Sequence, residues 1–88
     1  MSQHEKLLRR FLEKPIRTDL TYQELETLLF AFDYQEIKGD GSRVKFYRAD
    51  GTFPINIHKP HPGNLLKRYV VKEIQHILRR LRHDPSDI

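Results

Sequence analysis

Cysteine is absent from the 88 residues of this sequence. Its absence excludes a disulfide scaffold, a thiolate zinc site and a cysteine nucleophile, and it is consistent with a cytoplasmic protein. Long apolar runs are absent as well, so we expect no membrane-spanning helix and no membrane partner. The first five residues, Met-Ser-Gln-His-Glu, lack the apolar segment of a secretory signal. The length predicts one domain with a small core.

The sequence also lacks the motifs of several enzyme classes. It contains no glycine-rich loop of the Walker or dinucleotide-binding type. Its carboxylates do not cluster, which argues against a two-metal nuclease. His58 and His61 are near enough in sequence to share a metal, but no nearby carboxylate or cysteine completes such a site. We therefore expect neither a metal nor a small-molecule cofactor.

Positive charge is concentrated in the second half of the chain, and the net charge is +4. Residues 1–36 carry five Lys or Arg against seven Asp or Glu, a net charge of −2, whereas residues 37–88 carry eleven against five, a net charge of +6. Tyrosine and phenylalanine lie among these cations, a combination that fits an anionic partner such as nucleic acid. An ordinary solvated surface with a high isoelectric point is the alternative.

Two capping boxes predict the starts of two helices. Ser2 with Glu5 opens the first helix, which Pro15 ends at about residue 13 or 14. Thr21 with Glu24 opens the second, which ends near Asp33, and Leu20 and Leu25 form a hydrophobic staple across its start. The residues expected to face the core are Leu7, Leu8, Phe11 and Leu12 in the first helix and Leu25, Leu28, Leu29 and Phe32 in the second, with Phe30 and Ala31 widening the second stripe.

A third helix is predicted to start near Lys67 or Tyr69 and to end at His83-Asp-Pro85. Its basic C-terminal end is explained by the helix dipole, which favours cations there, so we do not count it as a sign of nucleic-acid binding. We expect Val70, Val71, Ile74, Ile77, Leu78 and Leu81 to face the core and Lys72, Glu73, Gln75, Arg79 and Arg80 to take the outer face.

Three short strands are predicted between the second and third helices. Residues 34–38 alternate weakly and form the first. Two further arms, residues 38–48 and 53–61, flank Ala49-Asp-Gly-Thr52, and an Asp-Gly between alternating runs is typical of a β-hairpin because glycine readily adopts a positive φ. One face of this hairpin is expected to carry Val44, Phe46, Phe53, Ile55 and Ile57, and the other Arg43, Lys45, Tyr47, Pro54, Asn56 and His58.

The predicted order is therefore α-α-β-β-β-α. We expect an α+β two-layer sandwich, in which helices cover one face of a three-stranded antiparallel sheet and the other face stays largely open. Residues 1–88 are treated as one domain, with an extra N-terminal helix in residues 1–19, a core in residues 20–82 and a tail in residues 83–88. Without the first helix, this is the order of the double-stranded RNA-binding domain, although such an order does not establish function.

A series of short motifs runs through residues 20–82. They are Glu24-Leu-x-x-Leu28-Leu29 in a helix, Asp33-Tyr34 before the first strand, Gly41-Ser42 before a cationic strand, a glycine turn, and a strand that reads Ile55-Asn-Ile57-His58. Together they resemble the HicA toxin family. The resemblance implies a double-stranded-RNA-binding-like fold and a ribosome-independent mRNA interferase of a bacterial or archaeal toxin–antitoxin system. It also implies cytoplasmic action on mRNA and neutralisation by a HicB-type antitoxin protein.

One position departs from the family pattern. The usual motif is Gly-Ser-His, and its histidine is the residue expected to be catalytic, but in this chain Arg43 follows Gly41-Ser42. The role of that histidine does not carry over to position 43. Either another residue takes the role, or this chain cleaves poorly or only binds.

Metal-free RNA cleavage needs a base for the ribose 2′-OH, a cation for the charge on the phosphorane and an acid for the leaving oxygen. Because histidine transfers protons near neutral pH, we predict His58 as the proton-transfer group and His61 as the second candidate. Arg43 would neutralise the phosphate with its planar fork. The predicted RNA-binding residues are Ser42, which orients phosphate or shapes the turn, Lys45 and Lys59, which steer the backbone, Tyr47, which stacks on a base, and Lys67.

Each of these residues also has a plainer interpretation. A histidine at a strand end is more often a surface residue, Arg43 and Lys45 would keep an exposed sheet soluble, and Tyr47 would pack across strands. His4, His76 and His83 are interpreted as structural. The alternatives to an endoribonuclease acting on single-stranded mRNA are a non-catalytic RNA-binding module and a protein-interaction domain whose basic face docks an acidic partner.

Overall fold

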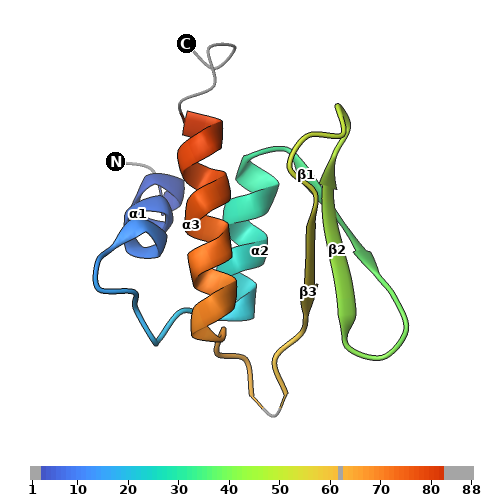
Figure 1. The fold of residues 1–88 in the computed structure, drawn as a ribbon, viewed down its shortest axis with the longest axis horizontal. Helices are drawn as coiled ribbons and strands as arrows, with labels where there is room; N and C mark the ends of the chain where they lie inside the picture. The colour runs from blue at the N-terminus through green and yellow to red at the C-terminus, as the bar shows by residue number, and fades with distance from the viewer. Residues whose placement is uncertain (1–2, 62, 83–88) are drawn as a thin grey trace.

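The computed structural model describes residues 3–61 and 63–82, and in them three helices and a three-stranded sheet follow the predicted order. α2 and α3 lie between α1 and the sheet (Figure 1). This arrangement confirms the predicted α+β fold. The elements are α1 (Gln3–Leu12), α2 (Tyr22–Ala31), β1 (Tyr34–Lys38), β2 (Arg43–Arg48), β3 (Ile55–His58) and α3 (Arg68–Arg82).

α2 begins at the predicted capping box. The Thr21 hydroxyl accepts a hydrogen bond from the Glu24 backbone N–H at 3.1 Å, and the Glu24 carboxylate accepts one from the Thr21 N–H at 3.0 Å. Leu20 and Leu25, on either side of this cap, are both buried. After the helix, Asp33 has a φ of 67°, a left-handed conformation that directs the chain into β1.

The buried face of α2 differs from the prediction at three residues. Phe30 is 47% exposed and Ala31 is also exposed, so neither is buried with the apolar stripe. Phe30 lies at the edge of the stripe, where its ring centroid is 6.5 Å from that of buried Phe46. Tyr22 instead completes the buried face one turn before Leu25.

The end of α1, at Leu12, comes one or two residues earlier than predicted.

Gln75 is the second correction. The prediction placed it on the outer face of α3, but it is only 4% exposed. Its Nε2 donates hydrogen bonds to the carbonyl oxygens of Phe11 at 2.8 Å and of Glu13 at 3.1 Å. The last carbonyls of a helix have no partner within the helix, so Gln75 satisfies the end of α1 from α3. The six apolar residues predicted to face the core from α3 are all buried.

The sheet has the order β1-β2-β3, and both pairs of neighbours are antiparallel. The alternation predicted for the hairpin holds in β2 and in β3 from Ile55 onward, since Val44 and Phe46 are buried opposite Ile57 and Ile55.

The connection between β2 and β3 is longer than the predicted four-residue turn. Gly51 has the expected positive φ, 75°, and its N–H donates to the Arg48 carbonyl at 2.9 Å. Phe53 was predicted in the strand but has a φ of 48°, which a strand residue does not adopt, so β3 begins only at Ile55. The Phe53 side chain still packs partly against the core.

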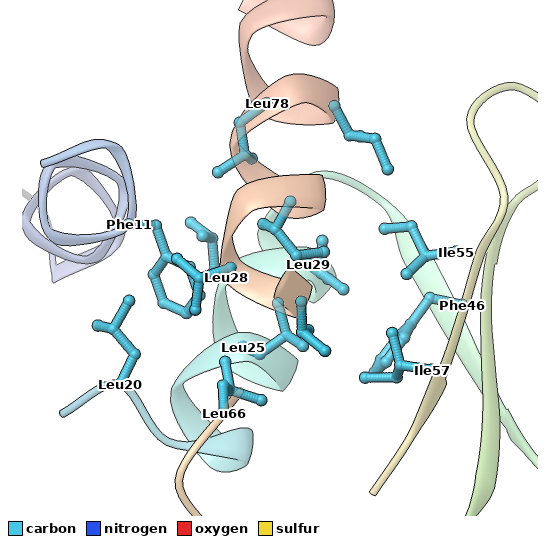
Figure 2. Close-up of a cluster of buried hydrophobic side chains, with 14 of the residues drawn as sticks. Phe11, Leu20, Leu25, Leu28, Leu29, Phe46, Ile55, Ile57, Leu66 and Leu78 are labelled. Atoms are coloured by element: carbon cyan, nitrogen blue, oxygen red, sulfur yellow. The ribbon is translucent and has the colours of Figure 1, made fainter. Parts of the chain in front are cut away.

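The core lies between the inner face of the sheet and the helices, and α1 contributes to it. Figure 2 shows Phe46 and Ile55 pointing from the sheet toward the helices and Phe11 pointing from α1 toward Leu28. Phe11 is fully buried, so α1 belongs to the folded core. The predicted capping residue Ser2, the histidine at position 83 and the tail at residues 83–88 lie outside the described residues. Within the described residues, no helix has the length and apolar character to cross a membrane.

Candidate functional site

The face of the sheet that points away from the helices carries polar, cationic and aromatic side chains. Arg43, Lys45, Asn56 and His58 on it are exposed, and Tyr47 is half-buried. Exposed Ile37 adds an apolar group beside them. We call this surface the open sheet face, and its members are Gln35, Ile37, Arg43, Lys45, Tyr47, Asn56 and His58.

The strand register brings the cations and the histidine together. Arg43 pairs directly with His58 across β2 and β3, and Lys45 pairs with Asn56. Directly opposite side chains in an antiparallel pair have Cβ atoms about 4.5–5.5 Å apart. Arg43 and His58 therefore lie side by side, with Lys45 two residues along the same face.

A hydroxyl holds the imidazole of His58. The Ser42 Oγ lies 3.2 Å from Nδ1 of His58, a hydrogen-bond distance. The backbone fixes this contact, because the Lys59 N–H donates to the Ser42 carbonyl at 2.7 Å. With Nδ1 occupied by the hydroxyl, Nε2 is the ring nitrogen left for a substrate.

Two hollows meet at His58. The first, which we call the sheet hollow, has a volume of about 390 Å³ and is lined by Arg43, Lys45, Asn56, Ile37 and His58, among others. The second, which we call the helix hollow, has a volume of about 290 Å³ and lies between the end of β3 and the start of α3. Its polar lining residues are Ser42, His58, Lys59, His61, Lys67 and Tyr69.

Of the predicted site residues, Arg43, Lys45, Tyr47 and His58 share the open sheet face, whereas Ser42, His61 and Lys67 line the helix hollow. The Tyr47 hydroxyl donates to Oε1 of Gln35 on β1 at 2.8 Å, which fixes the ring across the strands.

The Lys59 side chain points toward α2 and not toward the open sheet face. Its Nζ lies 5.5 Å from the centroid of the Tyr22 ring, within cation–π distance. The Tyr22 hydroxyl donates to the Glu36 carboxylate. Burial, and then this hydrogen bond, raise the pKa of Tyr22. Burial and a hydrogen bond with Glu36 also raise the pKa of Glu26. Lys59 thus adds its charge to a carboxylate cluster between α2 and β1.

Two exposed side chains at the hollows were not among the predicted site residues. Tyr69, in the first turn of α3, is 60% exposed and lines the helix hollow. Ile37 is 52% exposed and lines the sheet hollow. The alternation of β1 was a usable signal for Ile37, because it places this residue on the same side as Gln35. In residues 3–61 and 63–82, no group of three or more His, Cys, Asp or Glu side chains is placed to hold a metal ion.

The fold and the open sheet face define a small α+β protein that presents a cationic sheet surface beside a histidine held by a serine. The family model described as HicA toxin of bacterial toxin-antitoxin matches residues 22–82. This match covers more than half of the chain, and the protein belongs to the HicA toxin family. Membership assigns it a toxin role and implies an antitoxin partner. No curated protein and no solved structure gave a match.

Proposed function

We propose that this toxin is an endoribonuclease that cleaves single-stranded mRNA without a metal and is neutralised by a HicB-type antitoxin. The observation that carries the proposal is the direct pairing of Arg43 with His58 on the open sheet face. A cation and a proton-transfer group side by side, with no helix of the described chain over them, are what cleavage of a phosphodiester requires. Because mRNA is the substrate, the site of action is the cytoplasm of a bacterium or archaeon.

The reaction uses the 2′-hydroxyl of the RNA as the nucleophile. Nε2 of His58 takes the proton from this hydroxyl while its oxygen forms a bond to phosphorus. The Arg43 guanidinium neutralises the charge that develops on the phosphorane oxygens. The bond from phosphorus to the 5′-oxygen then breaks, and His61 gives a proton to that leaving oxygen. The products are a 2′,3′-cyclic phosphate and a 5′-hydroxyl end.

Ser42 determines which nitrogen of His58 is available for proton transfer. Its contact with Nδ1 fixes the plane of the ring and leaves Nε2 free for proton transfer. His61 lines the same helix hollow as His58, so both histidines border one hollow. Two proton-transfer groups at one phosphate allow one to act as base and the other as acid.

The remaining cations and the tyrosine would hold the RNA strand. Lys45, two residues from Arg43 on β2, would bind the next phosphate, and Lys67 would bind the strand at the helix hollow. Tyr47, fixed by Gln35, offers a ring for base stacking. Lys59 contributes its charge close by, although its amine lies over the Tyr22 ring.

The test is a digest of single-stranded RNA in the presence of EDTA with wild-type protein, Arg43→Ala and His58→Ala. His76→Ala, which changes an exposed histidine on α3, is the matched control. We expect His58→Ala to lower the cleavage rate by about 10²-fold or more, the usual contribution of a general base or acid. We expect Arg43→Ala to lower it strongly and His76→Ala to leave it unchanged. Undiminished cleavage by a folded His58→Ala variant removes His58 from the mechanism.

A non-catalytic RNA-binding module is the second candidate. The observation in its favour is Arg43 itself, which follows Gly41-Ser42 where the family pattern has its histidine. An arginine there binds phosphate but transfers no proton at physiological pH. RNA binding without cleavage in the EDTA digest selects this candidate. Neither binding nor cleavage selects a protein-interaction domain whose basic face docks an acidic antitoxin.

A further inference from the structure

The helix hollow contains an aromatic ring that the core does not use. Tyr69 is 60% exposed, although it lies in the first turn of a helix whose next two residues, Val70 and Val71, are buried. Its ring lines the same hollow as His61 and Lys67. An exposed ring beside cations is the arrangement on which nucleic-acid bases stack.

The charge of this hollow fits a nucleotide. Lys67, His58 and His61 line it, and no aspartate or glutamate is among its described lining residues. Lys59 also lines it, but its amine lies over the Tyr22 ring, so its charge is not counted here. The volume of the hollow, about 290 Å³, lies at the lower end of small-ligand sites, which suits a single nucleotide. Cations bind phosphate and an exposed ring stacks on a base, so the hollow fits a nucleotide whose base is unpaired.

The position of the hollow sets which nucleotide it would hold. His58 lines both this hollow and the sheet hollow, so the two hollows adjoin at this residue. A strand whose scissile phosphate sits at His58 extends into the sheet hollow on one side and into the helix hollow on the other. Tyr47, on the open sheet face, and Tyr69 then flank the phosphate from different elements.

We propose that the helix hollow is a nucleotide subsite for single-stranded RNA, in which Tyr69 stacks on an unpaired base next to the phosphate bound at His58 and Lys67 binds the phosphate of that base. This subsite rests on the proposed RNA-directed function but not on cleavage. It makes Tyr69 a determinant of affinity and of base preference at one position of the RNA. Stacking accepts every base and favours those with the larger ring system.

The absence of tryptophan from the sequence allows a direct test. Tyr69→Trp introduces a single indole into the hollow, and Leu65→Trp is the matched control, because Leu65 is 54% exposed four residues earlier but does not line the hollow. Each variant is titrated with a single-stranded oligonucleotide whose riboses are 2′-O-methylated, which prevents cleavage by removing the nucleophile. We expect saturable quenching of fluorescence in Tyr69→Trp and little change in Leu65→Trp. No quenching in Tyr69→Trp, or equal quenching in both variants, overturns the subsite.

A second measurement uses affinity. Tyr69→Ala is expected to weaken binding of the same oligonucleotide about tenfold, while Tyr69→Phe, which keeps the ring, stays within about twofold of wild type. Equal affinity for wild type and Tyr69→Ala also overturns the subsite and leaves the hollow to another class of partner, such as the antitoxin. If the protein does not cleave RNA, but Tyr69→Trp fluorescence is quenched and Tyr69→Ala binds the oligonucleotide about tenfold more weakly, the subsite is supported and the proposed nuclease activity is contradicted. If Tyr69→Ala cleaves RNA as fast as wild type and Tyr69→Trp fluorescence is not quenched, only the proposed nuclease activity is supported.

Discussion

Ser42 is the residue whose side chain most directly controls the orientation of His58, through the contact of 3.2 Å between its Oγ and Nδ1. If His58 transfers protons, Ser42→Ala leaves the imidazole in place but free to rotate. A hydrogen bond of this kind contributes about 0.5–1.5 kcal/mol, so we expect kcat for RNA cleavage to fall about two- to tenfold. KM should stay within about twofold, because Ser42 acts through His58. Initial rates of cleavage over a range of RNA concentrations give both values.

Thr27→Ala is the control for Ser42→Ala, since it removes an exposed hydroxyl that donates to the Gln23 carbonyl of its own helix, α2. Its cleavage kinetics should match those of wild type. A rise in KM at constant kcat in Ser42→Ala would show that the serine binds phosphate instead of orienting the imidazole.

At the residue scale, the sequence predicts which face a strand residue takes but not where a long side chain ends. Period-two alternation placed Arg43, Lys45 and His58 on one face, and the register pairs Arg43 with His58. Lys59 was grouped with them because it follows His58. Its amine lies over Tyr22, a residue 37 positions earlier, and no local pattern encodes that contact.

At the scale of elements, Gln75 joins α3 to the end of α1. Replacing it in Gln75→Leu leaves the carbonyl oxygens of Phe11 and Glu13 without their donor. An unsatisfied buried polar group costs about 1–3 kcal/mol, so we expect the free energy of unfolding to fall by that amount. Urea denaturation followed by circular dichroism measures it. His76→Ala, the exposed neighbour, should stay within about 0.5 kcal/mol of wild type, and an equally stable Gln75→Leu would show that water satisfies these carbonyls.

The sequence predicted the elements better than their buried faces. The Thr21 capping box and the apolar repeat in α3 are local signals, and both were correct. Gln75 was assigned to solvent because a polar side chain on a helix usually faces outward, and only the end of another helix explains its burial. Phe30 was assigned to the core because it is apolar, but it lies at the edge of the Leu25–Leu29 stripe, with its ring against Phe46 and 47% of its surface exposed.

The contact between α2 and β1 predicts a dependence of stability on pH. Burial, and then the hydrogen bond with Glu36, raise the pKa of Glu26 above its usual value. Lys38 and Lys59 oppose the rise, and Tyr22 completes the cluster through Glu36. A carboxyl whose pKa is raised by folding binds its proton more tightly in the native state. Its contribution to stability is therefore fully present below the unfolded pKa and is lost as the pH rises through the raised pKa.

Glu26→Gln places an uncharged amide where the carboxylate was. We expect this variant to be more stable than wild type at about pH 7, by up to about 1 kcal/mol because the cluster is partly in water, and to lose that advantage below about pH 4. Urea unfolding across this pH range measures the difference. Glu73→Gln, which replaces an exposed carboxylate on α3, is the control, and its stability relative to wild type should not change with pH in this way. A difference between Glu26→Gln and wild type that stays constant at all pH values would show that the raised pKa of Glu26 is not its cause.

At the scale of the whole molecule, the first 36 residues carry a net charge of −2 and the remaining 52 carry +6. The first group forms α1, α2 and the start of β1, and the second forms the rest of the sheet and α3. The fold places α1 on the far side of α2 and α3 from the sheet (Figure 1), so the acidic half of the chain lies largely away from the open sheet face. The sequence predicted the charge asymmetry, but the fold divides the positive half between two places: Arg43 and Lys45 lie on the open sheet face, whereas five further Lys or Arg lie on α3 in the helix layer.

The cations of the open sheet face and the helix hollow predict how RNA binding responds to salt. Binding of a single strand weakens with a slope of about −0.7 in log K against log salt for each phosphate contact. Three contacts, through Arg43, Lys45 and Lys67, give a slope of about −2 for an uncleavable oligonucleotide. Lys45→Ala should reduce the magnitude of the slope by about 0.7, whereas Lys6→Ala, an exposed lysine on α1, should leave it unchanged. Equal slopes for wild type and Lys45→Ala would place the RNA away from the centre of the open sheet face, because Lys45 is the cation there that lies between Arg43 and Tyr47.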